Sequence, residues 1–208
     1  MVCINSTFVL LFKITFQSNV HKRLDNSCMC LLWKVFQFII KSMGNISFVP
    51  PAKYQAQNKF LNEAIQEARI GIYNNHGGPF GSVIVREGKI IGRGHNHVLA
   101  NNDSTCHGEI DAIRKTEQDL QTFDLSGCEL YTTGEPCPMC LAACLWANIE
   151  KVYYGCSIDD NEKIGFRDKK FDNLMGGRKQ LEDYLIPIDR DACLSLFEEY
   201  NSLNRERY

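Results

Sequence analysis

The sequence predicts an α/β protein, a three-layer α/β/α sandwich around a mixed five-stranded sheet. Two observations favour this class. Segments of helical and β-type spacing succeed one another in the order α-β-β-α-β-α-β-(α)-β-α, which is typical of helices packed on both faces of one sheet. The chain has 208 residues, of which 44% are hydrophobic and 23% are charged, so it can bury a core without disulfide bonds.

The first regular segments are a helix and a hairpin. Apolar residues at helical spacing from Phe60 to Ile72 predict an amphipathic helix, which we expect Gly71 to end. After a glycine-rich loop, the β-rich runs Ser82–Arg86 and Lys89–Gly92 flank the turn-forming pair Glu87-Gly88. These two runs are therefore expected to pair as an antiparallel hairpin.

The remaining elements alternate between helix and strand. Ser104 or Thr105 can cap the next helix, because a side-chain oxygen there can accept hydrogen bonds from the first turn. The stretch from Ser157 to Arg178 has no clear period and is expected to be irregular. The expected bounds are a helix from about Cys106 to Leu120, a strand at Glu129–Thr133, a helix at Cys137–Trp146, a strand at Lys151–Gly155, a weak strand at Tyr184–Ile188 and a helix from Asp191 to about Asn201.

The first 42 residues differ in composition from the rest, with five basic residues and one acidic residue. Their apolar stretches are too short, or too interrupted by lysine, for a transmembrane helix. The segment Met29–Ile40 has helical spacing and could dock on a membrane surface or a partner. The favoured alternative is that Met43 is the true initiator. We expect an N-terminal extension at 1–52 and one functional domain at 53–208.

Charge and cysteine content exclude several classes. The formal net charge is −2 and the pI is about 6.2, so no overall basic field draws the chain to nucleic acid or to an anionic membrane. The ten cysteines are unevenly spaced, which favours thiols or a metal site in a reducing compartment over a disulfide framework. A cytoplasmic protein is expected, with neither nucleic acid nor a membrane as its partner.

Two short motifs carry the chemistry. They are His107-Gly108-Glu109 and Pro136-Cys137-Pro138-Met139-Cys140, which together match H-x-E…P-C-x-x-C. At a helix start, Cys137 and Cys140 lie on one face, where unpaired backbone N–H groups lower the pKa of a thiol. One imidazole and two thiolates provide three ligands for tetrahedral Zn²⁺ and leave the fourth position to water, as in catalytic zinc sites.

The glutamate of the first motif completes this interpretation. Glu109 lies two residues from His107, where it can carry a proton from the metal-bound water to a leaving nitrogen. Taken alone, the C-x-x-C pair would also suit a redox site or half of a structural zinc site. Cys106 and Cys144 are close enough in sequence to compete for the metal. The combined motifs favour one catalytic zinc per chain.

From about Phe60 to its C-terminus the chain resembles the cytidine/deoxycytidylate deaminase superfamily, and within it the bacterial-type guanine deaminases. The resemblance implies a cytidine deaminase-like fold and a zinc-dependent homodimer that hydrolyses guanine, a small nucleobase, to xanthine and ammonia. Gly108 departs from the alanine usual at that position in this subgroup. Besides the zinc motifs, the matching segments are Gly77-Gly78-Pro79-Phe80-Gly81, His95-Asn96-His97, Asn102-Asp103, Ala112-Ile113-Arg114, Trp146-Ala147, Gly165-Phe166-Arg167-Asp168 and the terminal Tyr208.

The resemblance also implies substrate contacts. Asn96 offers a donor and an acceptor to the edge of the base, and the carboxylate of Asp168 can accept from the N–H groups of guanine. Phe80 or His97 would lie against the face of the ring. Tyr208, at the C-terminus, would help to close the pocket and exclude water.

Other interpretations remain open for some of these residues and for the substrate. Asp168 also suits a solvated loop acid, and Phe80 and Trp146 suit core aromatics, which is the favoured role of Trp146. The alternative functions are deamination of another base or nucleoside (cytosine, guanosine or cytidine), deamination of tRNA adenosine, and zinc-stabilised binding without catalysis. An intact Glu109 argues against the last of these.

Overall fold

The computed structural model describes residues 56–176 and 181–205, which belong to one compact unit, Val49–Tyr208. The segment Met29–Ile40, which could form an amphipathic helix, lies outside the described residues. The described strands form one sheet in the order β2-β1-β3-β4-β5. Their bounds are β1 Gly81–Arg86, β2 Lys89–His95, β3 Cys128–Gly134, β4 Lys151–Cys156 and β5 Leu185–Pro187.

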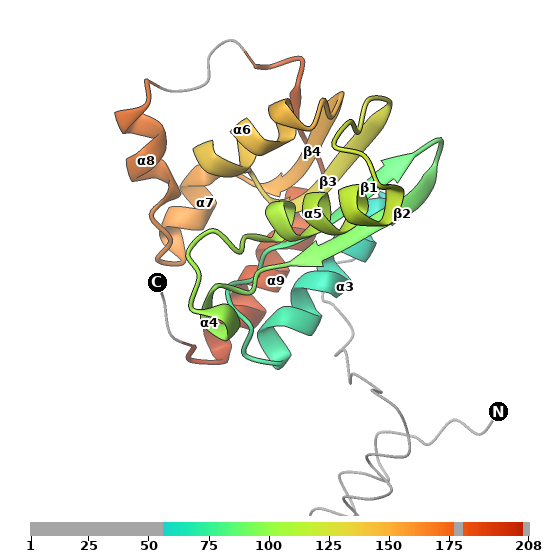
Figure 1. The fold of residues 1–208 in the computed structure, drawn as a ribbon. Helices are drawn as coiled ribbons and strands as arrows, with labels where there is room; N and C mark the ends of the chain where they lie inside the picture. The colour runs from blue at the N-terminus through green and yellow to red at the C-terminus, as the bar shows by residue number, and fades with distance from the viewer. Residues whose placement is uncertain (1–55, 177–180, 206–208) are drawn as a thin grey trace, which may run out of the picture. The chain divides into compact units, whose positions relative to one another are not determined.

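Helices cover both faces of this sheet (Figure 1). On one face α3 contacts β1 and α9 contacts β4, while on the other α5 contacts β2 and β1 and packs beside α6. None of the described helices is long and apolar enough to cross a membrane. The bounds are α3 Lys59–Tyr73, α4 Val98–Asn101, α5 Gly108–Leu120, α6 Pro138–Trp146, α7 Ile158–Lys163, α8 Asp168–Leu174 and α9 Arg190–Ser202. The expected three-layer α/β/α sandwich is confirmed.

Strand directions place the functional segments. β1 pairs antiparallel with β2 and β3, whereas β3, β4 and β5 run parallel, so the sheet is mixed as expected. Parallel neighbours end at the same edge of a sheet, and each needs a crossover connection. The segment after β3 therefore begins beside the segment after β4, and these segments carry α6 and α7. In sheets of this kind, ligands bind outside the carboxyl ends of the strands.

The hairpin between β1 and β2 turns as its sequence predicts. Glu87 and Gly88 both have positive φ, at 51° and 70°. Two central residues with positive φ define a type I′ turn, whose twist matches that of the flanking strands. The adjacent pair Arg86 and Lys89 closes the ladder. The expected hairpin is confirmed.

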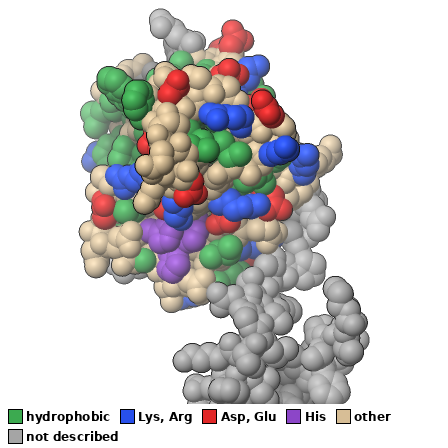
Figure 2. Space-filling model, turned by 45° about the vertical axis from the view of Figure 1, so that its right-hand side comes forward, with side chains coloured by type: hydrophobic (Ala, Val, Ile, Leu, Met, Phe, Trp, Pro, Cys, Tyr) green, Lys and Arg blue, Asp and Glu red, His purple; other side chains and the backbone are tan. Residues whose placement is uncertain are grey.

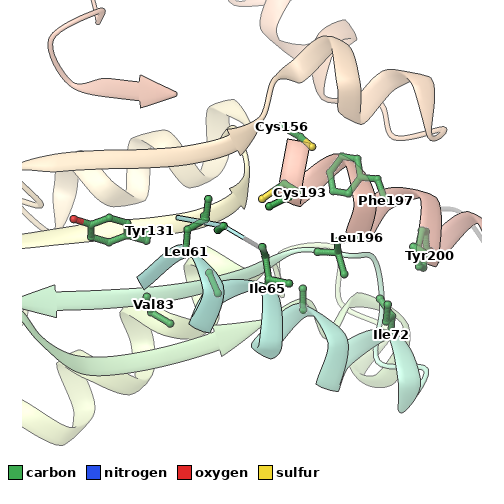
Figure 3. Close-up of a cluster of buried hydrophobic side chains, with 14 of the residues drawn as sticks. Leu61, Ile65, Ile72, Val83, Tyr131, Cys156, Cys193, Leu196, Phe197 and Tyr200 are labelled. Atoms are coloured by element: carbon green, nitrogen blue, oxygen red, sulfur yellow. The ribbon is translucent and has the colours of Figure 1, made fainter. Parts of the chain in front are cut away.

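The largest core cluster lies between α3, α9 and the sheet (Figure 3). Leu61 and Ile72 of α3 and Leu196, Phe197 and Tyr200 of α9 are almost fully buried. Each large apolar side chain buried in this way contributes about 1.5–3 kcal/mol to folding. This cluster fixes the two helices against the strands that support the functional edge.

Gly71 lies inside α3 and does not end it, so the expectation of a helix end there is wrong. The helix continues to Tyr73 and is capped by Asn74. A Cβ on Gly71 would lie 2.9 Å from Cδ2 of His95, which is closer than a side chain can pack. The missing side chain therefore lets α3 approach the end of β2.

The start of α5 also differs from the expectation. Neither Ser104 nor Thr105 caps the helix, which begins at Gly108 with His107 at the N-cap. The Asp103 carboxylate instead accepts hydrogen bonds from the backbone and hydroxyl of Thr105, at 2.8 and 2.7 Å, and holds them in a turn. This turn separates α5 from the short helix α4, which the sequence did not predict.

The stretch from Ser157 to Arg178 was expected to be irregular, but its described part contains α7 and α8. Helices this short bury too few residues to show a period. Ser157 starts α7 with a capping box, in which its side chain accepts from Asp160 N and its own N–H donates to the Asp160 carboxylate. The Ser-x-x-Asp spacing was a readable signal for this helix.

Trp146 is 85% exposed, so its expected place in the core is wrong. Cys140, Leu141 and Cys144 form the buried face of α6. Because successive helical residues are about 100° apart, Trp146 lies on the side opposite Cys144, two residues earlier. Helix geometry therefore turns its indole away from the sheet.

Candidate active site

Two helix starts provide the functional side chains at the carboxyl edge of the sheet. His107 is the N-cap of α5, and Cys137 is the N-cap of α6, where Pro138 takes the first helical position. Proline suits that position because its ring presets a helical φ and the N–H it lacks would have had no helical partner. Cys140 follows Cys137 within the first turn, so both thiols lie at the same helix end.

The three side chains have the spacing of a metal site. His107 Nδ1 lies 3.6 Å from Cys137 Sγ and 3.5 Å from Cys140 Sγ. Tetrahedral zinc, with Zn–N of about 2.0–2.1 Å and Zn–S of about 2.3 Å, holds its nitrogen and sulfur ligands about 3.5 Å apart. Both nitrogen–sulfur distances therefore match those of a tetrahedral zinc site.

The protonation of this group also favours a cation. A hydrogen bond from Cys140, together with the nearby His107, lowers the pKa of the Cys137 thiol to about 4. Burial and the hydrogen bond with Cys137 raise the pKa of Cys140. Burial lowers the pKa of His107, but the contact with Cys137 outweighs it and raises the value to about 9. A dication replaces these shared protons, because thiolates and neutral imidazole are the forms that bind metal.

Glu109 borders the same site. The residue is only 5% exposed, and it lines the same pocket as His107 and Cys137. Burial raises the pKa of its carboxyl to about 7, against the opposing effect of His107. A carboxyl with a pKa near neutrality can both take up and release a proton, as a general acid/base must.

The pocket measures about 370 Å³, within the range of small-molecule sites. Apolar side chains provide most of its exposed wall, and polar and charged side chains provide the rest. The apolar lining comes from Phe80, Met139, Phe166, Phe171 and Met175, and the polar lining includes Ser104, Glu135, Asn161, Arg167 and Asp168. Such a lining suits a flat ligand with a polar edge.

The short helices α7 and α8 build part of the polar side. Asn161 Nδ2 donates a hydrogen bond to Asp168 Oδ2 at 3.0 Å. This bond fixes the amide, and Asn161 Oδ1 is buried with no hydrogen-bond partner among the described residues. A buried acceptor left unpaired costs free energy, which a ligand with N–H donors would recover. Asp168 and Asn161 therefore give this wall two hydrogen-bond acceptors, a carboxylate and an amide oxygen.

Asn96, which follows β2, packs against the loop before β1 that carries Phe80. Asn96 Oδ1 accepts from the backbone N–H groups of Gly78 and Val98, at 3.4 and 3.1 Å, and its buried Nδ2 has no hydrogen-bond partner within the described part of the chain. The N–H of Asn96 donates to the carbonyl of Phe80 at 2.9 Å. The Phe80 ring borders the pocket edge-on to Phe166, with centroids 4.8 Å apart. Asn96 thus supports the loop that presents Phe80.

Comparisons with known proteins agree with this geometry. The family model for the cytidine and deoxycytidylate deaminase zinc-binding region matches residues 54–156. Guanine deaminase of Bacillus subtilis is 46% identical over 157 residues, which cover 72% of this chain and 97% of that protein. The chain belongs to the cytidine and deoxycytidylate deaminase family. The expected resemblance is confirmed, and the matched zinc-binding region includes His107, Cys137 and Cys140.

Solved deaminase structures share the fold. The structure of guanine deaminase from Nitrosomonas europaea has a TM-score of 0.61 at 30% identity and covers 72% of this chain and 86% of its own. The structure of the Bacillus subtilis guanine deaminase has a TM-score of 0.54 at 36% identity and covers 72% of this chain and 96% of its own.

The chain is also similar in sequence to deaminases of another name. A tRNA-specific adenosine deaminase of Streptococcus pyogenes serotype M18 is 34% identical over 161 residues, which cover 76% of this chain and 97% of that protein.

Other predicted residues lie apart from this deaminase pocket or outside the described residues. His97 borders a different pocket, so Phe80, of the two aromatic candidates, is the one that lines the site. The Cys106 thiol donates to Asp103 at 3.3 Å, and Cys144 is fully buried; neither joins the metal-binding group. Tyr208 lies outside the described residues.

Sequence analysis missed Asn161 and the wall formed by Phe166. The segment Gly165–Asp168 predicts a substrate contact through its aspartate, and Phe166 lies in the same segment, two residues before Asp168. Asn161 is preceded by the capping box at Ser157, which predicts a helix there. Nothing in the sequence alone shows that this helix returns to the zinc-binding motifs.

Proposed function

We propose that this protein hydrolyses guanine to xanthine and ammonia. The observation that carries this proposal is the 46% identity to Bacillus subtilis guanine deaminase across 97% of that enzyme. The geometry supports it, because Glu109 and two members of the His/Cys/Cys group, His107 and Cys137, line a pocket of about 370 Å³ whose wall is mostly apolar. A neutral planar base needs such a pocket and no basic groove.

His107, Cys137 and Cys140 would hold one zinc ion per chain. Zinc in this position would lower the pKa of a bound water to about 7 and so make it a nucleophile at neutral pH. Metal analysis should find about one tightly bound zinc per chain, and Cys137→Ala should lose both zinc and activity. Full activity in protein free of metal would refute this assignment.

Glu109 is the proposed proton carrier. Its buried carboxyl can accept a proton from the attacking water and deliver it to the exocyclic nitrogen, which leaves as ammonia. The products then balance, since one water enters and one ammonia leaves. Because Glu109 follows His107 by two residues at a helix start, it is held close to the metal ligands.

Asp168, Asn161 and Phe80 are the proposed base contacts. The carboxylate of Asp168 and the unpaired Oδ1 of Asn161 are acceptors, which complement the N–H donors of guanine. The ring of Phe80 would pack on the base. Asn96 and Tyr208 were assigned by resemblance, Asn96 to the base edge and Tyr208 to pocket closure, and both roles remain proposals.

A tRNA adenosine deaminase is the second candidate, because such enzymes are also relatives, at 34% identity. The net charge of −2 gives no general attraction to an RNA backbone. The test is to incubate the purified zinc protein with guanine, adenine, cytosine, guanosine, cytidine and tRNA, and to measure ammonia release. Guanine should be the best substrate. A preference for tRNA or for any nucleoside would refute the proposal.

The expected homodimer has a candidate surface. Leu145 and Trp146 of α6 are 48% and 85% exposed. On α8, a helix that contacts α6, and just after it, Phe171, Leu174 and Met175 are 42%, 75% and 73% exposed. An apolar surface of this kind marks an interface. Trp146→Glu should shift the sedimentation mass from dimer to monomer, whereas Phe123→Glu, at another exposed aromatic, should not. A monomeric wild-type protein would refute pairing.

The domain boundary is also a proposal. Residues 1–52 are proposed to be an extension dispensable for catalysis, so a chain that begins at Met43 should keep its activity and melting temperature. Loss of solubility on truncation would show that the extension is a structural element.

A cytoplasmic location of the protein is also proposed. The seven described cysteines are free, which agrees with a reducing compartment such as the cytoplasm.

A further inference from the structure

Three histidines outside the catalytic group gather in one surface patch (Figure 2). His76 follows α3, His95 ends β2 and His97 is the N-cap of α4. One ring nitrogen from each lies within 4.8 Å of the others. The rings are stacked, with centroids 4.1 Å apart for His95 and His97 and 4.9 Å apart for His76 and His97. We name these three residues the histidine cluster.

Two of these rings have the hydrogen bonds of metal ligands. His95 Nδ1 lies 3.4 Å from the carboxylate of Glu67, and His97 Nδ1 lies 2.8 Å from the carbonyl oxygen of His95. Both partners are acceptors, so each favours a proton on Nδ1 and a free lone pair on Nε2. Metal-bound histidines typically donate their second N–H to a carboxylate or a carbonyl in this way.

The third ring faces the free nitrogen of His95. His76 Nδ1 lies 2.9 Å from His95 Nε2. Two imidazole nitrogens bound at about 2.0–2.1 Å to one ion are about 3.0 Å apart at a right angle and about 3.4 Å apart at a tetrahedral angle. The planes of the two rings are only 10° apart, with centroids at 5.2 Å, and the two nitrogens face each other in a hydrogen bond. The His76 ring must therefore turn out of this hydrogen bond before both nitrogens can bind one ion. Burial and the neighbouring His95 lower the pKa of His76 and His97, which favours the neutral, metal-binding form of these two rings.

We propose that His76, His95 and His97 bind one divalent transition-metal ion, separate from the zinc at His107. Imidazole nitrogens suit Zn²⁺, Ni²⁺ and Cu²⁺. Because His76 and His97 are partly exposed, water can complete the coordination. The carboxylates of Glu67 and Asp111, which approach His95 and His97, offset part of the charge of the ion.

The ion would connect three segments next to the deaminase pocket. His76 immediately precedes the loop Gly77–Phe80, and His95 and His97 flank Asn96. The three ligands come from the end of α3, the end of β2 and the start of α4. Binding therefore fixes the loop that presents Phe80, and it should raise the melting temperature of the protein.

The test uses the full chain with its zinc, dialysed against a weak chelator until the metal content is constant. Ni²⁺ is then added at pH 7.5 and followed by calorimetry. One Ni²⁺ should bind per chain without release of zinc. His76→Asn and His97→Asn should each weaken Ni²⁺ binding by at least about 100-fold, because loss of an outer partner alone costs about 10–100-fold. The zinc content of both variants should stay unchanged.

Two substitutions serve as controls. His21→Asn makes the same chemical change outside the described residues, and Cys106→Ser removes a thiol near the histidine cluster; both should keep Ni²⁺ binding. The bound Ni²⁺ should show no thiolate charge-transfer absorption, since its ligands are nitrogens. Absence of binding by the wild type, undiminished binding by both cluster variants, or a thiolate band would overturn the proposal. Circular dichroism and melting curves separate lost binding from lost folding.

Discussion

Asp168→Ala tests the proposed recognition of guanine most directly. Asp168 opens α8, borders the pocket and accepts a hydrogen bond from Asn161 at 3.0 Å. Its removal takes away a charged acceptor for the base and frees the Asn161 amide to turn. A hydrogen bond to a charged group contributes about 1.5–3 kcal/mol. At about 1.4 kcal/mol per factor of ten, kcat/KM for guanine should fall about 10- to 150-fold.

The assay is steady-state xanthine formation, with the zinc content measured on the same samples. Zinc should stay bound, because Asp168 is not among the metal ligands. Asp172→Ala, one turn further along α8 and away from the pocket lining, is the matched control and should change kcat/KM by no more than about twofold. If Asp168→Ala also stays within about twofold of wild type, or if the control loses as much, the assigned contact is wrong.

Three further predictions concern the proton carrier, an ion pair and the mobility of the pocket wall. Glu109→Gln should keep zinc but lose about 10²- to 10⁴-fold in kcat, because an amide cannot accept and return the proton; retention of a tenth of the rate would require another base. Arg190 donates hydrogen bonds to the Asp160 carboxylate at 2.6 and 2.7 Å, which hold the pKa of that carboxyl below its ordinary value. The ion pair therefore stabilises the fold fully above the ordinary carboxyl pKa of about 4, and this stabilisation is lost as the pH falls. Arg190→Ala should therefore lower the free energy of unfolding by about 1–3 kcal/mol at pH 7 and by less at pH 3. An equal loss at both pH values would contradict this pH dependence. In hydrogen exchange, α8 should exchange faster than α5, because α8 has no buried residue among those described; equal protection would refute this difference.

The grouping of His107, Cys137 and Cys140 could be predicted because its geometry is local. Cys137 and Cys140 lie within one helical turn, so their spacing alone brings both sulfurs together. Placing His107 beside them needs only the sheet, since α5 and α6 pack on the same face. The alternating pattern of strands and helices predicted that sheet, and the structure confirmed it.

The pocket wall could not be predicted in the same way. Asn161 and Phe166 come from a stretch where α7 and α8 are too short for a hydrophobic period. Their approach to the zinc-binding motifs depends on the parallel pairing of β3 and β4, a contact between distant segments that sequence spacing does not encode. Gly71 was misjudged for a similar reason, because its neighbour in space is His95, on another element.

The difference between these two parts of the site has a physical basis and a functional consequence. The catalytic group lies at the ends of α5 and α6, which bury residues against the sheet, so its geometry is held by the core. Asp168, the proposed base contact, lies on α8, which buries none of its residues. Substitutions on α8 therefore cost little folding free energy. A protein built in this way can change the base that it recognises while the geometry of its metal-binding group stays fixed. This agrees with the finding that both a guanine deaminase and a tRNA-specific adenosine deaminase are similar to this chain.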